Sequence, residues 1–401
     1  MHHSWDKIFR LKRRKVLIYV KDIHGGTGRF IESLVTLAQR DKRYFKNIDF
    51  KIVSNVDGRS LNLRIKKLST NLTIHKSLSI SGVFKSLFNF IELYKLACQY
   101  KPDVIFSLDI YANITILILN LFLKKKAKLI TSTHINLTEY IESRTSSLFS
   151  YISTLAIKKL YNFSDIHLAP SVELKKQLVN TYKIDSNKIT SIPYPVDVKK
   201  IKYLSKTLQG NHKDIKRKTN ILNILSMGRF EAQKGFDMLL ESISEIKAHF
   251  PKELERIHIY ILGKGKQKEK YKEFIKNNHL NDKVTLLKWT NNPFPILKMA
   301  DIFVFVSNYE CFPNVLLEAQ ALSVPTISSD VDFGPREILD YGQYGVLLKD
   351  RSASEIMRNI IKLSKNGILR KEMKLNSISA INRYSWRTLR SEYRRLLYSS
   401  K

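Results

Sequence analysis

Short apolar runs alternate with longer amphipathic segments along the first half of the chain. Runs of four to six residues rich in Val, Ile and Leu are typical of buried parallel strands, and apolar residues spaced three and four apart are typical of helices. The expected strands are Val16–Val20, Asp49–Ser54, Leu72–His75, Val104–Asp109, Lys128–Ser132, Ile166–Ala169 and Lys188–Ile192. The clearest expected helices are Phe30–Arg40, Val83–Tyr100, Ser146–Tyr161 and Val172–Tyr182. This alternation predicts a parallel sheet with helices on both faces.

A polar, basic stretch at Lys199–Lys218 interrupts the pattern, and we interpret it as the boundary between two domains. A second alternating region follows, with expected strands at Ile221–Met227, Ile257–Leu262, Val284–Leu287, Ile302–Val306, Pro325–Ser328 and Val346–Leu348. A chain of 401 residues is long enough for two hydrophobic cores. We therefore predict an α/β protein with domains at residues 1–200 and 201–383, followed by an amphipathic basic helix at 384–401.

The stretch Val304–Leu339 contains the most informative chemistry. A strand is followed by a loop that ends at Pro313, and a helix begins near Asn314. Proline suits a helix entry, and the free N–H groups of the first turn, around Asn314 and Val315, form an anion site. Glu310 precedes this anion site and Glu318 lies about one turn inside the helix. A ligand with phosphate in the middle and hydroxyls at both ends would fit, and a nucleotide-sugar has that shape.

Glycine-rich loops follow other strands. HGGTG (24–28) follows the first strand, GRFEAQKG (228–235) the first strand of the second domain, and LGKGKQ (262–267) the next one. Glycine allows the backbone to approach a ligand at the carboxyl edge of a sheet. In GRFEAQKG, Arg229 and Lys234 flank a turn into a helix, where two cations could clamp a diphosphate.

The chain resembles the retaining GT-B glycosyltransferases of family 4. The resemblance is carried by these loops, by STH (132–134) and by the spacing Glu310-x7-Glu318, which follow one another in the same order as in that family. The resemblance covers nearly the whole chain. It implies two Rossmann-like domains facing across a cleft, with the donor mostly on the C-terminal domain and the acceptor mostly on the N-terminal one. The final helix would return to the first domain.

The resemblance also implies roles for individual residues. Arg229 and Lys234 would neutralise the departing nucleoside diphosphate, Glu310 would hold the donor sugar, and Glu318 the ribose. His134 would lie near the transferred sugar, where a neutral imidazole could accept a hydrogen bond from a hydroxyl. The remaining expected contacts to the nucleotide-sugar are Gly25, Gly26, Gly228, Gly263, Asn292, Phe312, Pro313, Asn314 and Val315. One departure stands out, because Cys311 occupies the position after the first Glu where the family usually has Gly.

The function that the resemblance implies is retaining transfer of a hexose or N-acetylhexosamine. The donor would be a nucleotide-sugar, with a UDP-sugar favoured. The acceptor would be a glycan or a polyprenyl-diphosphate-linked glycan in polysaccharide or lipopolysaccharide biosynthesis. No cofactor and no metal are expected. Asp330-Val331-Asp332 resembles a DxD metal motif, but it lies where the family has a variable loop and no further acid pair completes a site.

Three other functions remain open. A sugar-nucleotide epimerase shares the fold, and a non-catalytic glycan- or lipid-binding homologue would keep it without transfer. A nucleic-acid binder would fit the charge, but the sequence contains neither an RNA-binding aromatic signature nor zinc-finger spacing. We therefore expect no nucleic-acid partner.

The net charge of +33 is the main anomaly of composition. It favours an anionic membrane surface, although a lysine-rich composition that only maintains solubility is the alternative. The apolar face of Ser79–Tyr100 is wide, and with Lys7, Arg10, Lys12 and neighbouring cations it could dock on acidic lipid. An ordinary core helix is the other interpretation of that segment.

No signal peptide is visible, and the most apolar window, Ile110–Leu123, is too short to span a bilayer. We interpret it as a buried helix, against partial membrane insertion. Cys98 and Cys311 lie far apart in sequence and suggest neither a disulfide framework nor a metal site. The expected location is the cytoplasm, peripheral on the inner face of the cytoplasmic membrane.

Overall fold

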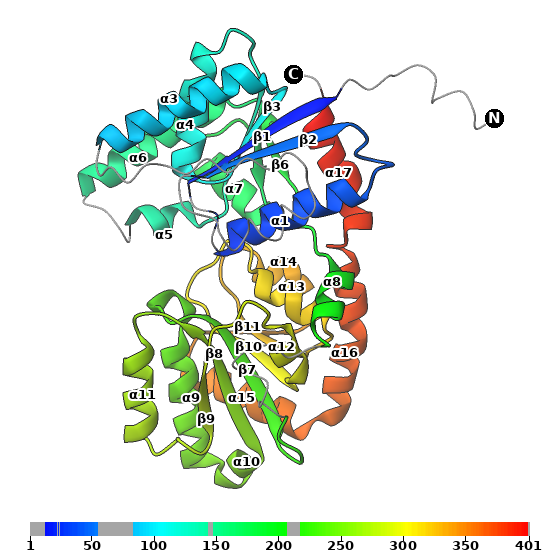
Figure 1. The fold of residues 1–401 in the computed structure, drawn as a ribbon. Coiled ribbons are helices and arrows are strands. Elements are labelled where there is room, and N and C mark those ends of the chain that lie inside the picture. Colours follow the sequence, from blue (N-terminus) through cyan, green and yellow to red (C-terminus); the bar gives the residue numbers. More distant parts are fainter. Residues whose placement is uncertain are drawn as a thin grey trace, which may run out of the picture. The chain divides into compact units, whose positions relative to one another are not determined.

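The computed structural model describes residues 13–21, 23, 25–54, 83–142, 147–206 and 217–399, with helical residues 83–87, 142 and 147–149 as backbone only. The chain forms two compact units (Figure 1). The first comprises Met1–Pro195 and Trp386–Lys401, and the second comprises Val196–Ser385.

The first unit contains a six-stranded parallel sheet in the order β2-β1-β3-β4-β5-β6. The strands are β1 (Arg14–Val20), β2 (Ile48–Ser54), β3 (Val104–Ser107), β4 (Lys128–Ser132), β5 (Ile166–Ala169) and β6 (Ile189–Ser191). The prediction of a parallel sheet is confirmed, and the expected bounds of β4 and β5 match. The expected strand Leu72–His75 lies outside the described residues.

Helices α1 (Gly25–Arg40), α3 (Val83–Tyr100), α4 (Ile110–Phe122), α6 (Ser147–Leu160) and α7 (Val172–Asn180) connect these strands, with a short α5 (Leu137–Glu142) before α6. Right-handed crossovers place α3, α4 and α6 on the face opposite to α1, because the chain steps in opposite directions along the sheet. Figure 1 shows this arrangement. The expected strand to Asp109 is two residues too long, because the Asp109 side chain caps α4 by accepting from Ala112 N.

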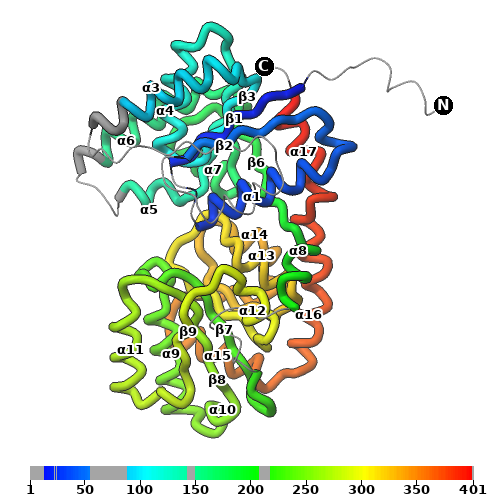
Figure 2. The backbone as a smooth tube through the Cα atoms, in the orientation of Figure 1, coloured from blue at the N-terminus to red at the C-terminus, as the bar shows by residue number. Residues whose placement is uncertain are grey.

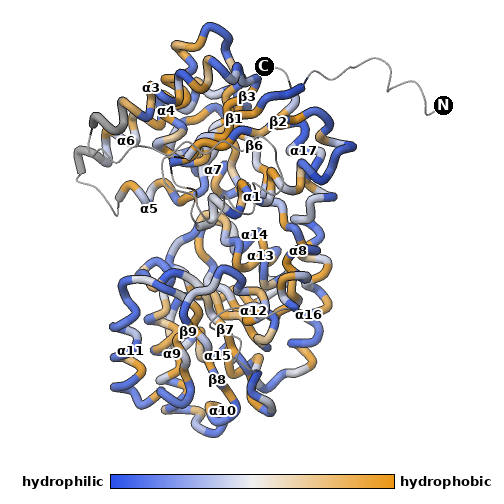
Figure 3. Tube along the Cα trace, in the orientation of Figure 1, coloured by the Kyte–Doolittle hydropathy of each residue, from blue (hydrophilic) through white to orange (hydrophobic). Residues whose placement is uncertain are grey.

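Our interpretation of Ile110–Leu123 as a buried helix is only half right. Its inner face is buried, with Ile116 and Leu119 fully enclosed, but Leu121 is 73% exposed and Phe122 61% exposed. Because apolar residues predominate in α4 (Figure 3), composition does not reveal which side packs. No helix among the described residues has the length and apolar character needed to cross a bilayer.

The last helix, α17 (Trp386–Tyr398), packs within the first unit and lies beside β1, β2 and α1 (Figure 2). Trp386 donates through Nε1 to the Asp41 carboxylate at 3.1 Å, and the Tyr393 hydroxyl donates to the carbonyl of Pro193 at 2.8 Å. At the far end, Lys128 Nζ donates to the carbonyl of Leu396 at 3.1 Å. The final helix is therefore held to the rest of the first unit along its length.

The second unit contains another six-stranded parallel sheet, in the order β12-β11-β10-β7-β8-β9. Its strands are β7 (Leu222–Arg229), β8 (Ile257–Lys264), β9 (Val284–Lys288), β10 (Ile302–Phe305), β11 (Thr326–Ser329) and β12 (Val346–Leu348). The covering helices are α9 (Phe236–His249), α10 (Pro251–Glu255), α11 (Lys268–Asn277), α12 (Phe294–Met299), α13 (Asn314–Ala321), α14 (Pro335–Ile338), α15 (Ala353–Lys365) and α16 (Gly367–Asn382). All six strands expected in this half are confirmed.

The boundary between the units lies earlier than the predicted linker. Val196 pairs with Ser385 in an isolated parallel bridge, and its N–H donates to the carbonyl of Tyr384 at 2.9 Å. The next residues form α8 (Val198–Leu204), which belongs to the second unit. The difference of five residues arises because a basic helix resembles a polar linker in sequence, whereas a pairing between residues almost 190 positions apart leaves no local pattern.

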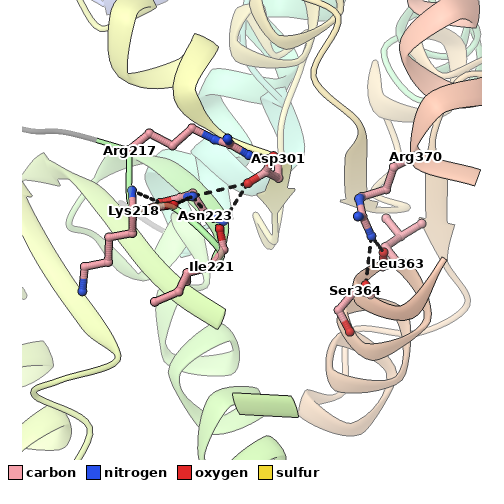
Figure 4. Close-up of polar contacts among 8 residues, drawn as sticks. All are labelled: Arg217, Lys218, Ile221, Asn223, Asp301, Leu363, Ser364 and Arg370. Carbon is pink, nitrogen blue, oxygen red and sulfur yellow. Dashed lines mark hydrogen bonds and ion pairs between the residues drawn. The ribbon is translucent and has the colours of Figure 1, made fainter. Parts of the chain in front are cut away.

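At the amino edge of the second sheet, a polar cluster fixes the chain as it enters β7 (Figure 4). Asp301 receives hydrogen bonds from Arg217 at 2.5 Å and from the Asn223 backbone N–H at 2.9 Å. The Asn223 amide in turn donates to the carbonyls of Lys218 and Ile221. The backbone N–H and carbonyl groups at this end of β7 are thus hydrogen-bonded to side chains.

Candidate functional site

Two loops at the carboxyl edge of the second sheet are joined by hydrogen bonds. One is the turn Ala232–Lys234 after β7, and the other is the loop 307–313 after β10. Asn308 donates from its backbone N–H to the carbonyl of Gln233 at 2.8 Å and from its amide to the carbonyl of Ala232 at 2.7 Å. The Gln233 amide donates to the carbonyl of Tyr309 at 3.0 Å. These bonds hold both candidate cations close to the first candidate glutamate.

Lys234 and Glu310 form a direct ion pair between the two loops. Their side chains are only 16% and 11% exposed, so a mobile surface pair is excluded. The Lys234 stem lies over Gly228, where an added Cβ would sit 3.2 Å from the methylenes, and its ammonium lies 5.8 Å from the centre of the Phe305 ring. The structure thus presents a positive charge at a fixed position beside a carboxylate.

Arg229 belongs to the same cluster but is more open. Its guanidinium contacts Glu231 at 3.0 Å and donates to the amide oxygen of Gln233 at 2.9 Å, and the side chain is 57% exposed. Because Gln233 also bonds the Tyr309 carbonyl, Arg229 is linked through one residue to the loop that carries Glu310. The guanidinium is therefore held by two polar side chains while it stays exposed to an anionic ligand.

Internal packing leaves no space for a side chain at two glycines of this edge, Gly235 and Gly263. Gly235 has φ +63°, and an added Cβ would lie 2.1 Å from the carbonyl oxygen of Val306. A Cβ on Gly263 would lie 2.3 Å from the carbonyl oxygen of Gly228, its partner across the ladder. Close packing of β7, β8 and β10 is therefore sufficient to explain Gly235 and Gly263. The expected nucleobase contact of Gly263 stays a prediction.

Helix α13 begins at Asn314, as predicted, with Pro313 as its N-cap residue. Cys311, Phe312 and Glu318 are all buried, at 5%, 4% and 5% exposure. Burial raises the pKa of the Cys311 thiol, and the Glu310 carboxylate raises it further, so this thiol stays protonated. Cysteine in place of glycine therefore adds a buried apolar group under the loop rather than a nucleophile.

Two further expectations meet partners within the second unit. The Asn292 amide donates to the carbonyl of Leu204 at the end of α8, at 2.9 Å, so its side chain supports the packing of α8. Its predicted nucleobase contact remains a prediction. Asp330 receives a bidentate contact from Arg336, at 2.7 Å and 3.0 Å. Among the described residues there is no group of three or more His, Cys, Asp or Glu side chains with metal-ligand geometry.

In the first unit, the glycine-rich segment after β1 opens directly into α1. Gly25 has φ +70° and open space around its Cβ position, while a Cβ on Gly28 would lie 1.8 Å from the carbonyl oxygen of Ile23. Gly25 and Gly26 are exposed. Gly28 is thus required for packing, and the exposed pair leaves the backbone at the start of α1 accessible. His24 lies outside the described residues.

His134 follows β4 at the carboxyl edge of the first sheet, as predicted, and its ring lies 5.0 Å from that of Phe30 on α1. Both ring nitrogens have protein partners: Nε2 contacts Ser132 Oγ at 2.8 Å and Nδ1 contacts the Tyr194 hydroxyl at 2.5 Å. Ser132 Oγ already donates to the carbonyl of Ser107, so it accepts from Nε2–H, and Nδ1 accepts from Tyr194. Burial lowers the pKa of His134 to about 3, which keeps the ring neutral.

This arrangement bears on the expected role of His134. A neutral ring is present, but the nitrogen that was expected to accept from a sugar hydroxyl already accepts from Tyr194. Contact with the transferred sugar therefore stays a prediction for the residue, and the ring nitrogens would have to exchange partners to make it. Sequence reasoning missed Tyr194, Gln233 and Asn308, which position the expected groups, because their partners are distant in sequence.

Comparison with known proteins identifies the class of this fold and site. Two six-stranded parallel sheets with flanking helices match the two-domain α/β fold named GT-B. Among solved structures, the protein resembles Alr3699/HepE of Anabaena in complex with UDP and glucose, with a TM-score of 0.75 and 16% identity over 96% of this chain and all of that one. A glycosyltransferase from Rickettsia africae ESF-5 also has a TM-score of 0.75, at 18% identity, over 97% of this chain and 100% of that one.

Sequence comparison places the chain within a family. The model "Glycosyltransferase Family 4" matches residues 24–200, and "Glycosyl transferases group 1" matches residues 209–379. An uncharacterised glycosyltransferase of Methanocaldococcus jannaschii, MJ1059, is 31% identical over 69% of this chain and 71% of its own length. A Campylobacter jejuni 4-α-N-acetylgalactosaminyltransferase that acts on a diphospho-undecaprenol glycan is 26% identical over 72% of this chain and 76% of its own. The chain belongs to the GT-B glycosyltransferases.

Proposed function

We propose that this protein is a retaining, family 4 glycosyltransferase that moves a hexose or N-acetylhexosamine from a UDP-sugar to a glycan or a polyprenyl-diphosphate-linked acceptor in polysaccharide biosynthesis. The observation that carries the proposal is the partly buried Lys234–Glu310 pair. It lies beside Arg229, and Glu310 is four residues before the start of α13. This cluster offers cations for a diphosphate and a carboxylate for sugar hydroxyls within one pair of joined loops.

The chemistry requires a good leaving group. The bond between the anomeric carbon and the β-phosphate oxygen breaks, and the electron pair goes to that oxygen. Lys234 and Arg229 would oppose the charge that develops there, and the first N–H groups of α13 would add hydrogen bonds. Glu310 would hold the donor sugar so that the acceptor hydroxyl reaches the anomeric carbon. The acceptor proton leaves with the diphosphate or with solvent.

Two relatives support the choice of substrates. HepE is described in complex with UDP and glucose, and the Campylobacter jejuni relative is named for a diphospho-undecaprenol acceptor. Buried Glu318 on α13 suits the ribose hydroxyls, because a carboxylate in a desolvated position can accept two hydrogen bonds.

We also propose that no metal takes part, because the fixed cations of this cluster occupy the role that a divalent ion has in other phosphate-transfer sites. A lipid-linked acceptor would be reached at an anionic membrane surface, which the net charge of +33 favours. The proposed location is therefore the cytoplasm, peripheral on the inner face of the cytoplasmic membrane.

A thermal-shift screen with UDP-, GDP- and ADP-sugars tests the donor, since a ligand that binds the native state raises the melting temperature. We expect the largest shift with UDP-sugars in the presence of a chelator. Shifts with none of the three, or a shift that depends on an added divalent ion, would remove the proposed donor site.

A further inference from the structure

The large apolar side chains that the first unit exposes are unevenly distributed. Those on its helices α3, α4 and α6 include Ile91, Ile118, Leu121, Phe122, Tyr151 and Ile152, with exposures from 40% to 73%. On the opposite face, within residues 25–40 and 386–399, no large apolar side chain is exposed. Helices α3, α4 and α6 lie on the same side of the first sheet (Figure 1). We call these exposed side chains the apolar surface of the first unit.

Helix α4 is the centre of this surface. Its positions 111, 114, 118, 121 and 122 follow helical spacing and are exposed or half-buried, so they form one continuous stripe. Phe122 contacts Phe90 of α3 at 6.2 Å between ring centres. Between α3 and α4 there is a hollow of about 260 Å³, lined by Phe90, Tyr111, Ile114, Thr115 and Ile118. An apolar stripe and hollow of this kind are unusual on a surface that only faces water.

Three lysines follow the stripe directly. Lys124, Lys125 and Lys126 are all exposed. The Lys126 ammonium donates to the carbonyls of Asn120 and Leu121 at the end of α4, at 2.7 Å and 2.8 Å, and Lys125 pairs with Asp103 at 2.7 Å. The Lys126 ammonium is therefore anchored at the end of α4, where Leu121 and Phe122 are exposed.

We propose that the apolar surface of the first unit docks on an anionic bilayer, with Leu121 and Phe122 inserted below the headgroups and Lys124–Lys126 among the phosphates. Lipid fits better than a protein partner, because lysine is depleted from protein interfaces whereas lysine beside aromatic residues is typical of membrane-surface helices. This inference deepens the proposed membrane association and rests on it. The sequence suggested a lipid contact through the apolar face of Ser79–Tyr100. The proposal places this contact mainly on α4 instead.

Flotation of the full chain with phosphatidylcholine vesicles, with and without phosphatidylglycerol, tests the proposal without any nucleotide-sugar. We expect the wild type to bind the phosphatidylglycerol vesicles. The double variant Leu121→Ser/Phe122→Ser should bind at least about thirtyfold more weakly, because two exposed apolar side chains no longer leave water. Lys124→Gln should lose about fivefold, and only with the anionic vesicles.

The matched control is Leu375→Ser/Ile378→Ser, which removes two apolar side chains that are 61% and 53% exposed on α16 of the second unit. It should bind like the wild type. Equal loss in the control, or full binding by the α4 variant, overturns the assignment of the surface. A wild type that transfers sugar to a water-soluble acceptor but binds no vesicle overturns the docking and leaves the proposed transferase activity intact.

Discussion

Replacing Lys234 by Met helps to separate two roles of its ammonium, namely binding the donor diphosphate and neutralising Glu310. The variant keeps an apolar stem over Gly228 but removes the charge that faces Glu310. If the ammonium binds the donor diphosphate, its loss removes a charge-assisted hydrogen bond worth about 1.5–3 kcal/mol, so affinity for UDP should fall about 10- to 150-fold. The variant should also melt at a lower temperature, because the partly buried Glu310 carboxylate loses its partner.

The alternative is that Lys234 only neutralises Glu310, which would otherwise repel the diphosphate. The double variant Lys234→Met/Glu310→Gln decides between the two roles. We expect its melting temperature to recover and its UDP affinity, measured by titration calorimetry, to stay low. Glu310→Gln alone should bind UDP about as well as the wild type, because its expected partner is the sugar.

The exposed Lys276 at the end of α11 provides a control, and Lys276→Met should change neither quantity. Full UDP affinity in the double variant would refute a direct contact between Lys234 and the diphosphate.

Three further predictions address the site and the fold. Glu318→Gln should lower transfer at least about tenfold, a loss of roughly 1.4 kcal/mol, and wild-type turnover would exclude Glu318 from the site. Gly235→Ala should lower the melting temperature far more than Gly25→Ala. The two φ angles are similar, at +63° and +70°, but only Gly235 has no space for a Cβ. Similar melting temperatures for the two variants would contradict the packing described for Gly235. Burial lowers the pKa of His134 and of His167 to about 3 each, so the unfolded chain binds more protons between pH 6.5 and 3, and the free energy of unfolding should fall as the pH drops through this window. Urea titrations at pH 7 and 5.5 should show this loss, and His134→Gln should lessen it.

The sequence predicted well those features that are set by local pattern. The expected limits of strands β4 and β5, for example, match the structure. Helix α1 was expected from Phe30 but begins at Gly25, because glycine is a poor helix former and the pattern contains no apolar residue there. The start of α13 at Asn314 was predicted because proline suits a helix entry, where its missing N–H removes no intrahelical hydrogen bond.

Features that depend on distant partners could not be predicted in this way. The pairing of Lys234 with Glu310 joins residues 76 positions apart, and His134 reaches Tyr194 across 60 positions. No local pattern indicates which hydrogen-bond partner a neutral imidazole takes, so the sequence assigned the His134 ring to a ligand although the protein occupies both nitrogens. The exposed side of α4 was missed for the same reason, since burial is decided by what packs against a helix.

The most direct test of the proposed function is a transfer assay with a purified polyprenyl-diphosphate-linked glycan, an α-linked UDP-sugar and a chelator, followed by NMR of the product. The proposal predicts one UDP released for each sugar transferred and an α-linkage in the product. A β-linked product, transfer only after a divalent ion is added, or no transfer from any nucleotide-sugar would contradict it.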